Sequence, residues 1–181
     1  GRKPVRVRVS PTARRPDLTI RLFSYPDNCY LYGKYHIMHT LKNEILTVQV
    51  KEHGAELASI RKGSVEYLWQ ADPMFWGRHS PVLFPIVGSV WEKRYRVDGR
   101  EFELGQHGFA RDMDFTMVEG GEDEVRYRLE STEDTLKKYP WPFVLEIAYR
   151  LHGNMIDVIW EVSNPGNEDM MCAYRAFLAL S

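Results

Sequence analysis

The sequence predicts an all-β fold, an antiparallel β-sandwich with one short helix, and three observations support this prediction. Apolar and polar residues alternate with a period of two over several stretches, as expected for strands with one buried face. Turn signals separate these stretches at short intervals, which is typical of antiparallel sandwiches. Only one segment has the pattern and end signals of a helix.

The predicted strands begin just after Met38 and are paired by recognisable turns. Asp98-Gly99 supplies the positive φ angles of a two-residue type I′ turn and predicts a hairpin. Gly120-Gly121 predicts a second hairpin, and His152-Gly-Asn154 joins two long alternating segments. The strands expected from this pattern are residues 46–50, 95–97, 100–104, 114–118, 124–130, 143–151 and 156–162.

The single predicted helix covers Thr132 to Lys138. Ser131 or Thr132 is the expected N-cap, and acidic residues in the first turn with lysines in the last suit the helix dipole. Pro140 and Pro142 end it.

Composition restricts the protein class. The chain has 181 residues, of which 44% are apolar and 27% charged, as expected for one globular domain. It contains no apolar run of about 20 residues and no signal-peptide h-region, so no membrane partner and a cytoplasmic location are expected. Cys29 and Cys172, the two cysteines, exclude a disulfide scaffold and a cysteine-rich zinc module.

The net charge of −1 conceals an uneven distribution. Residues 1–37 contain eight basic and two acidic residues, a net +6, so the remainder carries −7. A basic arm on an acidic body could bind nucleic acid. However, the aromatic residues of this segment gather at one end and do not interleave with its charges. We therefore expect a poorly ordered extension over residues 1–37, a folded domain over residues 38–181, and no nucleic-acid partner.

Two segments carry candidate chemistry, while dinucleotide, P-loop, serine-hydrolase and zincin motifs are absent. In residues 67–88, Pro81 and Pro85 bracket an apolar run, which argues for an irregular segment that lines a binding site, with Arg78 at the entrance of that site. In Gln106–Arg111 a histidine and an arginine four residues apart could bind and polarise hydroxyl oxygens. On composition alone, an ordinary loop with a solvated arginine is an equally open interpretation of the first segment, and the spacing in the second segment is weak evidence by itself.

Taken together, these motifs resemble one family. The stretch from His39 to about Asp169 resembles the N-terminal part of the aldose 1-epimerase (galactose mutarotase-like) family. It is most similar to the bacterial mutarotase-related branch, which also resembles glucose-6-phosphate 1-epimerases. The resemblance rests on Gly54–Ile60, Tyr67–Gln70, Trp76–Gly88, Gln106–Arg111 and Tyr139–Pro140 with the hairpin after it.

The resemblance implies a fold, an activity and site residues. It implies a β-sandwich with a sugar site on its concave face, which interconverts the α and β anomers of an aldose or aldose phosphate without metal or organic cofactor. His107 would be the catalytic acid near the ring oxygen, and it would bind the monosaccharide together with Arg78 and Arg111. Trp76 or Phe109 would supply an apolar wall.

The C-terminal part departs from the family pattern. Cys172–Phe177 stands where a Gly-His-Pro motif with a second histidine should begin, and the region of the family's glutamate base lies beyond Ser181. We therefore expect an N-terminal fragment with impaired activity that self-associates through exposed strand edges. The alternative is a non-catalytic carbohydrate-binding β-sandwich module that keeps Arg78 and His107.

Overall fold

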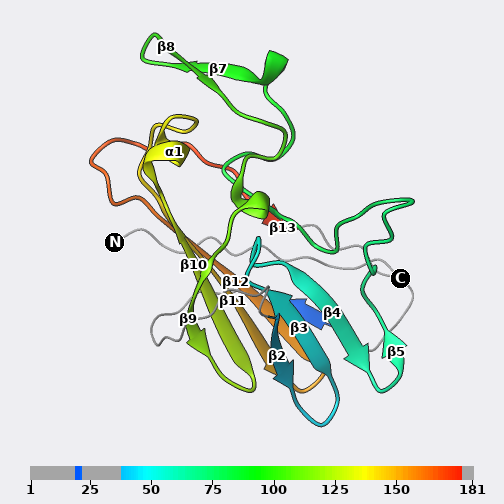
Figure 1. The fold of residues 1–181 in the computed structure, drawn as a ribbon. Coiled ribbons are helices and arrows are strands. Elements are labelled where there is room, and N and C mark those ends of the chain that lie inside the picture. The colour runs from blue at the N-terminus through cyan, green and yellow to red at the C-terminus, as the bar shows by residue number, and fades with distance from the viewer. Residues whose placement is uncertain (1–18, 22–37, 177–181) are drawn as a thin grey trace.

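Two β-sheets that pack against each other form most of the molecule (Figure 1). The computed structural model describes residues 19–21 and 38–176. One sheet has the strand order β1-β12-β11-β10-β9 and the other β2-β3-β4-β5. Neighbouring strands run antiparallel except for β1, which is parallel to β12. The predicted all-β antiparallel fold is confirmed.

The strands of the first sheet are β1 (Thr19–Arg21), β9 (Thr116–Gly120), β10 (Glu124–Glu130), β11 (Val144–His152) and β12 (Met155–Ser163). Those of the second are β2 (Met38–Lys42), β3 (Thr47–Lys51), β4 (Leu57–Lys62) and β5 (Val65–Glu66). Two short pairs complete the fold, namely β6 (Val82–Leu83) with β13 (Arg175–Ala176), and β7 (Arg94–Val97) with β8 (Arg100–Glu103). Figure 1 shows the β7–β8 hairpin standing away from the two main sheets.

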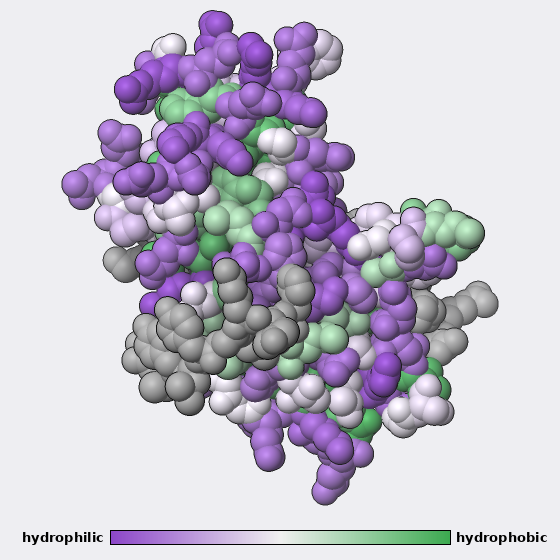
Figure 2. Space-filling view, viewed as in Figure 1, coloured by the Kyte–Doolittle hydropathy of each residue, from purple (hydrophilic) through white to green (hydrophobic). Residues whose placement is uncertain are grey.

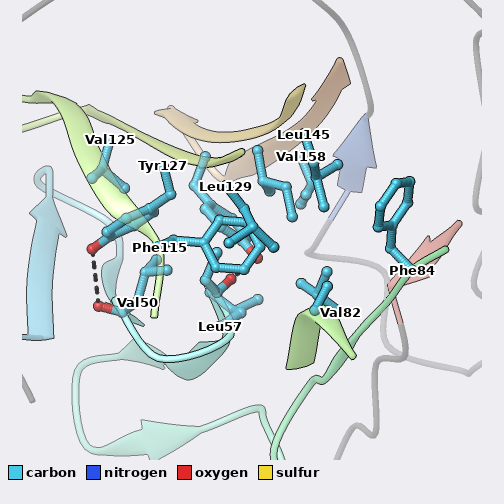
Figure 3. Packing of buried hydrophobic residues seen from close by; sticks show 14 of the residues in the cluster. Val50, Leu57, Val82, Phe84, Phe115, Val125, Tyr127, Leu129, Leu145 and Val158 are labelled. Carbon is cyan, nitrogen blue, oxygen red and sulfur yellow. Dashed lines mark hydrogen bonds between the residues drawn. The ribbon is translucent and has the colours of Figure 1, made fainter. Parts of the chain in front are cut away.

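The core lies between the two sheets. Alternate residues of each strand point inward, as the period of two requires, so that β3 contributes Val48 and Val50 and β10 contributes Val125, Tyr127 and Leu129. Figure 3 shows the side chains of both sheets meeting in this layer. The buried Tyr127 hydroxyl donates to the Val50 carbonyl at 3.4 Å, which satisfies its polar end within the core.

The predicted local elements are confirmed. Asp98 and Gly99 both have positive φ at the β7–β8 turn. The helix is α1 (Glu133–Leu136), and Thr132 caps it through a reciprocal pair of hydrogen bonds with Thr135. Short 3₁₀ turns occur at η1 (Trp91–Lys93) and η2 (Ala110–Asp112). None of the helices in the described ranges is long and apolar enough to cross a membrane.

The structure differs from the sequence prediction at the N-terminal extension and before the proline-rich segment. Thr19–Arg21 forms β1 along the Met155 end of β12, so at least this part of the extension pairs with the folded domain. The expectation for the rest of residues 1–37 lies outside the described residues. Strands β4 and β5 were not predicted, because residues 54–66 lack strict alternation; β4 is buried at four consecutive positions, Leu57–Ile60. Strands β2, β6 and β13 were not predicted either, and β6 lies in the run bracketed by Pro81 and Pro85 that was expected to be irregular.

Candidate functional site

The two candidate segments lie side by side. The Phe84 carbonyl accepts the backbone N–H groups of Phe109 and Ala110 at 3.0 and 3.2 Å. Gly88, four residues after Phe84, accepts the backbone N–H of His107 at its carbonyl, at 2.7 Å. These backbone bonds join the proline-rich segment to the histidine-containing segment, so motifs about twenty residues apart in sequence form one surface.

Gly108 is required where the two segments cross. Its φ is +70°, a conformation that residues with a Cβ rarely adopt, and a Cβ built here would collide with the Phe84 carbonyl and the Pro85 ring. Gly108 therefore permits the close approach of the two backbone segments.

His107 presents a defined hydrogen-bonding face. The Gly88 N–H donates to its Nδ1 at 2.9 Å, so the neutral ring carries its proton on Nε2. Burial, and then the positive charge of Arg111, lower the pKa of His107 below its ordinary value of 6.5. At neutral pH the side chain is therefore a neutral imidazole that offers an Nε2–H donor.

Arg78 and Arg111 meet at a residue that the sequence analysis did not select. Nη2 of Arg78 donates to Asp112 Oδ1 at 2.6 Å, and Nε of Arg111 lies 3.5 Å from Asp112 Oδ2. Nη2 of Arg111 also donates to the Gln106 carbonyl at 3.0 Å. Arg78, Arg111 and Asp112 thus form one ion-pair cluster, and the charge of Arg111 also acts on His107. The only signal for Asp112 in the sequence is its place directly after the motif.

A second group of polar residues holds the segment that follows Arg78. Glu56 Oε1 accepts the backbone N–H groups of His79 and Ser80 at 2.9 and 3.0 Å. Lys51 Nζ lies 3.3 Å from Glu56 Oε2 and 3.1 Å from His79 Nδ1. Because Glu56 belongs to the Gly54–Ile60 motif, that motif positions the arginine-containing loop by accepting its backbone amides.

The two predicted aromatic residues occupy different environments. The Phe109 side chain packs against Phe84 and Phe143 and is only 8% exposed, so its ring belongs to the core. Trp76 is partly exposed, and its carbonyl accepts the indole N–H of Trp69 at 2.8 Å. Of the two, Trp76 is the one with surface available to a ligand.

Trp76 belongs to the loop between β5 and β6, which projects from the body (Figure 1). Figure 2 shows apolar surface on this projection. Met74 and Phe75 account for it, since both are largely exposed.

Elsewhere, the first sheet has a hollow on its outer face. Its volume is about 360 Å³, and none of the predicted site residues lines it; its walls are Arg128, Glu130, Val144, Glu146, Glu161 and Ser163. Within residues 19–21 and 38–176, no three His, Cys, Asp or Glu side chains are placed to hold a metal ion.

Lowering the pH should destabilise the fold through His79 and His107. Burial is the main cause of the lowered pKa of both, followed by Lys51 for His79 and Arg111 for His107. Each contribution is fully present above the unfolded pKa of about 6.5 and is lost as the pH falls through the lower folded pKa. We expect the free energy of unfolding, measured by urea titration, to be smaller at pH 5.5 than at pH 7.5. The double variant His79→Asn/His107→Asn should show a smaller difference; an unchanged difference would contradict this assignment.

Comparison with known proteins identifies the family. Residues 38–174 match the family model described as aldose 1-epimerase. The chromosomal and plasmid LacX proteins of Lactococcus lactis subsp. lactis are each 41% identical to the chain in an alignment of length 138 that covers 72% of this chain and 46% of each relative. The chain therefore spans about half the length of the curated relatives it matches.

Solved structures agree in fold. A galactose mutarotase related enzyme from Lactobacillus acidophilus has a TM-score of 0.73 at 38% identity, over 74% of this chain and 45% of that protein. A galactose mutarotase-like protein from Lactobacillus casei has a TM-score of 0.71 at 34% identity, over 74% of this chain and 46% of that protein. With the family match covering more than half of its residues, the chain belongs to the aldose 1-epimerase family.

Proposed function

We propose that this chain carries the aldose-binding part of an aldose 1-epimerase site and acts in the interconversion of α and β anomers. The observation that carries the proposal is the arrangement of His107, whose Nδ1 accepts the Gly88 N–H, so that Nε2 carries the ring proton and is the donor. The charge of Arg111 acts on His107, and Asp112 joins Arg111 to Arg78. Such a set of donors suits the oxygens of a sugar ring.

In the proposed reaction, the neutral imidazole of His107 donates its Nε2–H in a hydrogen bond to the ring oxygen and stabilises the negative charge that develops there, while water supplies the proton that this oxygen takes up. A base removes the proton of the C1 hydroxyl, the C1–O5 bond breaks, and the open-chain aldehyde rotates before the ring closes on its other face. The two arginines bind hydroxyl oxygens, and Trp76 offers an apolar surface to the ring. No residue of this chain is assigned as the base, because Asp112, the carboxylate in the cluster, already faces both arginines.

His107→Ala tests the proposal. A single positioned hydrogen-bond donor contributes about 10²–10³-fold, so the variant should lose the acceleration of optical-rotation change that the unmodified chain gives with fresh α-D-glucose or α-D-galactose. His152→Ala is the matched control. This partly exposed histidine lies at the end of β11 and bonds to Asp157 at 2.7 Å, outside the proposed site.

Binding must be measured beside the rate, by isothermal titration with the same sugars. Binding together with acceleration that His107→Ala removes supports the catalytic proposal. Binding without acceleration would contradict catalysis by this chain and favour the alternative, a non-catalytic carbohydrate-binding module. Absence of binding would contradict both.

A further inference from the structure

Asp112 lies between the guanidinium groups of Arg78 and Arg111 and occupies the position that an anion bound to both arginines would take. It takes one arginine on each oxygen, with Oδ1 2.6 Å from Arg78 Nη2 and Oδ2 3.5 Å from Arg111 Nε. The buried Nε of Arg111 has no hydrogen-bond partner among the described residues, so this ion pair is the contact that it makes there. Asp112 therefore acts as the internal counter-ion of the pair.

Two convergent arginines form a general anion site. Their planar guanidinium groups offer paired N–H donors that match carboxylate and phosphate oxygens. The Arg78 side chain is 35% exposed and that of Asp112 51%, so the Arg78–Asp112 contact is open to solvent and within reach of a ligand. A phosphate entering here would compete with the Asp112 carboxylate for the same donors and would meet its negative charge.

A neutral sugar neither competes with the Asp112 carboxylate for the same donors nor is repelled by its negative charge. Hydroxyl oxygens can accept from donors of Arg78 that Asp112 does not use, since an arginine has five N–H groups. The Nε2–H of His107, a residue on which the charge of Arg111 acts, provides another donor. The ion pair then orients the arginines without having to break.

We propose that Asp112 is a specificity-determining residue that keeps the arginine pair from binding phosphate, so that the site takes unphosphorylated aldoses in preference to aldose phosphates. The preference between sugars rests on the proposed function. The blocking of the anion position rests on the contacts of Asp112 alone.

Asp112→Asn tests the proposal with little change in shape, because the amide oxygen can still accept from Arg78. Asp114→Asn is the matched control. It makes the same change in net charge two residues away, at a side chain that is 80% exposed and paired with His53. Binding of inorganic phosphate, D-glucose and D-glucose 6-phosphate would be measured by isothermal titration at about 10 mM ionic strength, where screening is weak. Thermal unfolding of each variant would check that it is folded.

We expect Asp112→Asn to bind inorganic phosphate and glucose 6-phosphate at least about tenfold more tightly than the unmodified chain, since facing like charges cost several kcal/mol. Asp114→Asn should change these affinities less than about twofold, because its charge is exposed and screened. Equal gains in the two variants would overturn the proposal, as would an unmodified chain that prefers the phosphorylated sugar.

The inorganic phosphate arm separates this inference from the proposed function. If no variant binds either sugar but Asp112→Asn gains phosphate affinity, the proposed function fails while Asp112 still blocks an anion site. If glucose binds to all variants and phosphate affinity does not change, the proposed function stands and the role of Asp112 is wrong.

Discussion

Replacing Arg126 by methionine should lower the free energy of unfolding by about 3–5 kcal/mol, the usual cost of removing one partner from a buried ion pair. Arg126 is 1% exposed on β10, although its position in the strand alternation faces away from the core. Nη1 donates to Glu146 at 3.1 Å and to Glu161 at 2.6 Å, while Nε and Nη2 lie 3.7 and 3.9 Å from Glu119 and Glu124. Removing this arginine would leave four carboxylates close together with less positive charge between them.

Arg128→Met is the matched control for Arg126→Met. Arg128 lies on the same face of the same strand and donates to Glu146, but its side chain is 31% exposed, so water can replace it. We expect a loss of about 1 kcal/mol or less for this variant. Urea unfolding followed by circular dichroism would measure both. Adding Glu146→Gln to Arg126→Met should recover part of the loss, and equal losses for the two arginines would contradict the account.

Features that depend on neighbouring residues could be predicted from the sequence. The β7–β8 hairpin follows from Asp98-Gly99, whose positive φ angles need no distant partner. The α1 cap follows from Thr132 in the same way. The long strands β11 and β12 follow from apolar alternation, because a sheet with one face in the core imposes that pattern.

Features that depend on distant pairing could not be predicted. The burial of Arg126 arises from the register of β10 with β9 and β11, which places Arg126 opposite Glu119 and two residue pairs from Glu146. In strand β10 alone, Arg126 resembles any outward-facing charge. Strand β1 likewise has three residues, too few to show a period of two.

The site could be predicted only in part, because some of its contacts also join residues that are distant in the sequence. His107, Arg78 and Arg111 were selected because their motifs resemble the family. Asp112 and Glu56 were missed, since each acts by contacting a loop that lies more than twenty residues away. Phe109 lies in the motif, but its ring is directed into the core by packing against Phe84 and Phe143, which no local pattern shows.

Gly108 lies where the His107 segment crosses the Phe84–Pro85 segment. Gly108→Ala should therefore both lower the free energy of unfolding and displace the His107 side chain. The added methyl group would be strained at a φ of +70° and would press on the Phe84 carbonyl and the Pro85 ring. To relieve the contact, the two segments must separate, which lengthens the bonds that the Phe84 carbonyl accepts from Phe109 and Ala110. Backbone strain and overpacking each cost about 1–3 kcal/mol, so we expect a combined loss of about 2–6 kcal/mol.

Gly63→Ala separates the two causes. Gly63 also has a positive φ, +60°, but a Cβ there meets nothing within 4 Å. It should therefore lose only the strain, about 1–2 kcal/mol, and keep the sugar affinity of the unmodified chain. Gly108→Ala should lose more stability and also lose sugar binding, because the Gly88–His107 bonds lie at the same crossing. Urea unfolding and isothermal titration with D-galactose would measure the two effects. Equal stability losses, with sugar binding kept in both variants, would mean that the close approach at Gly108 does not position His107.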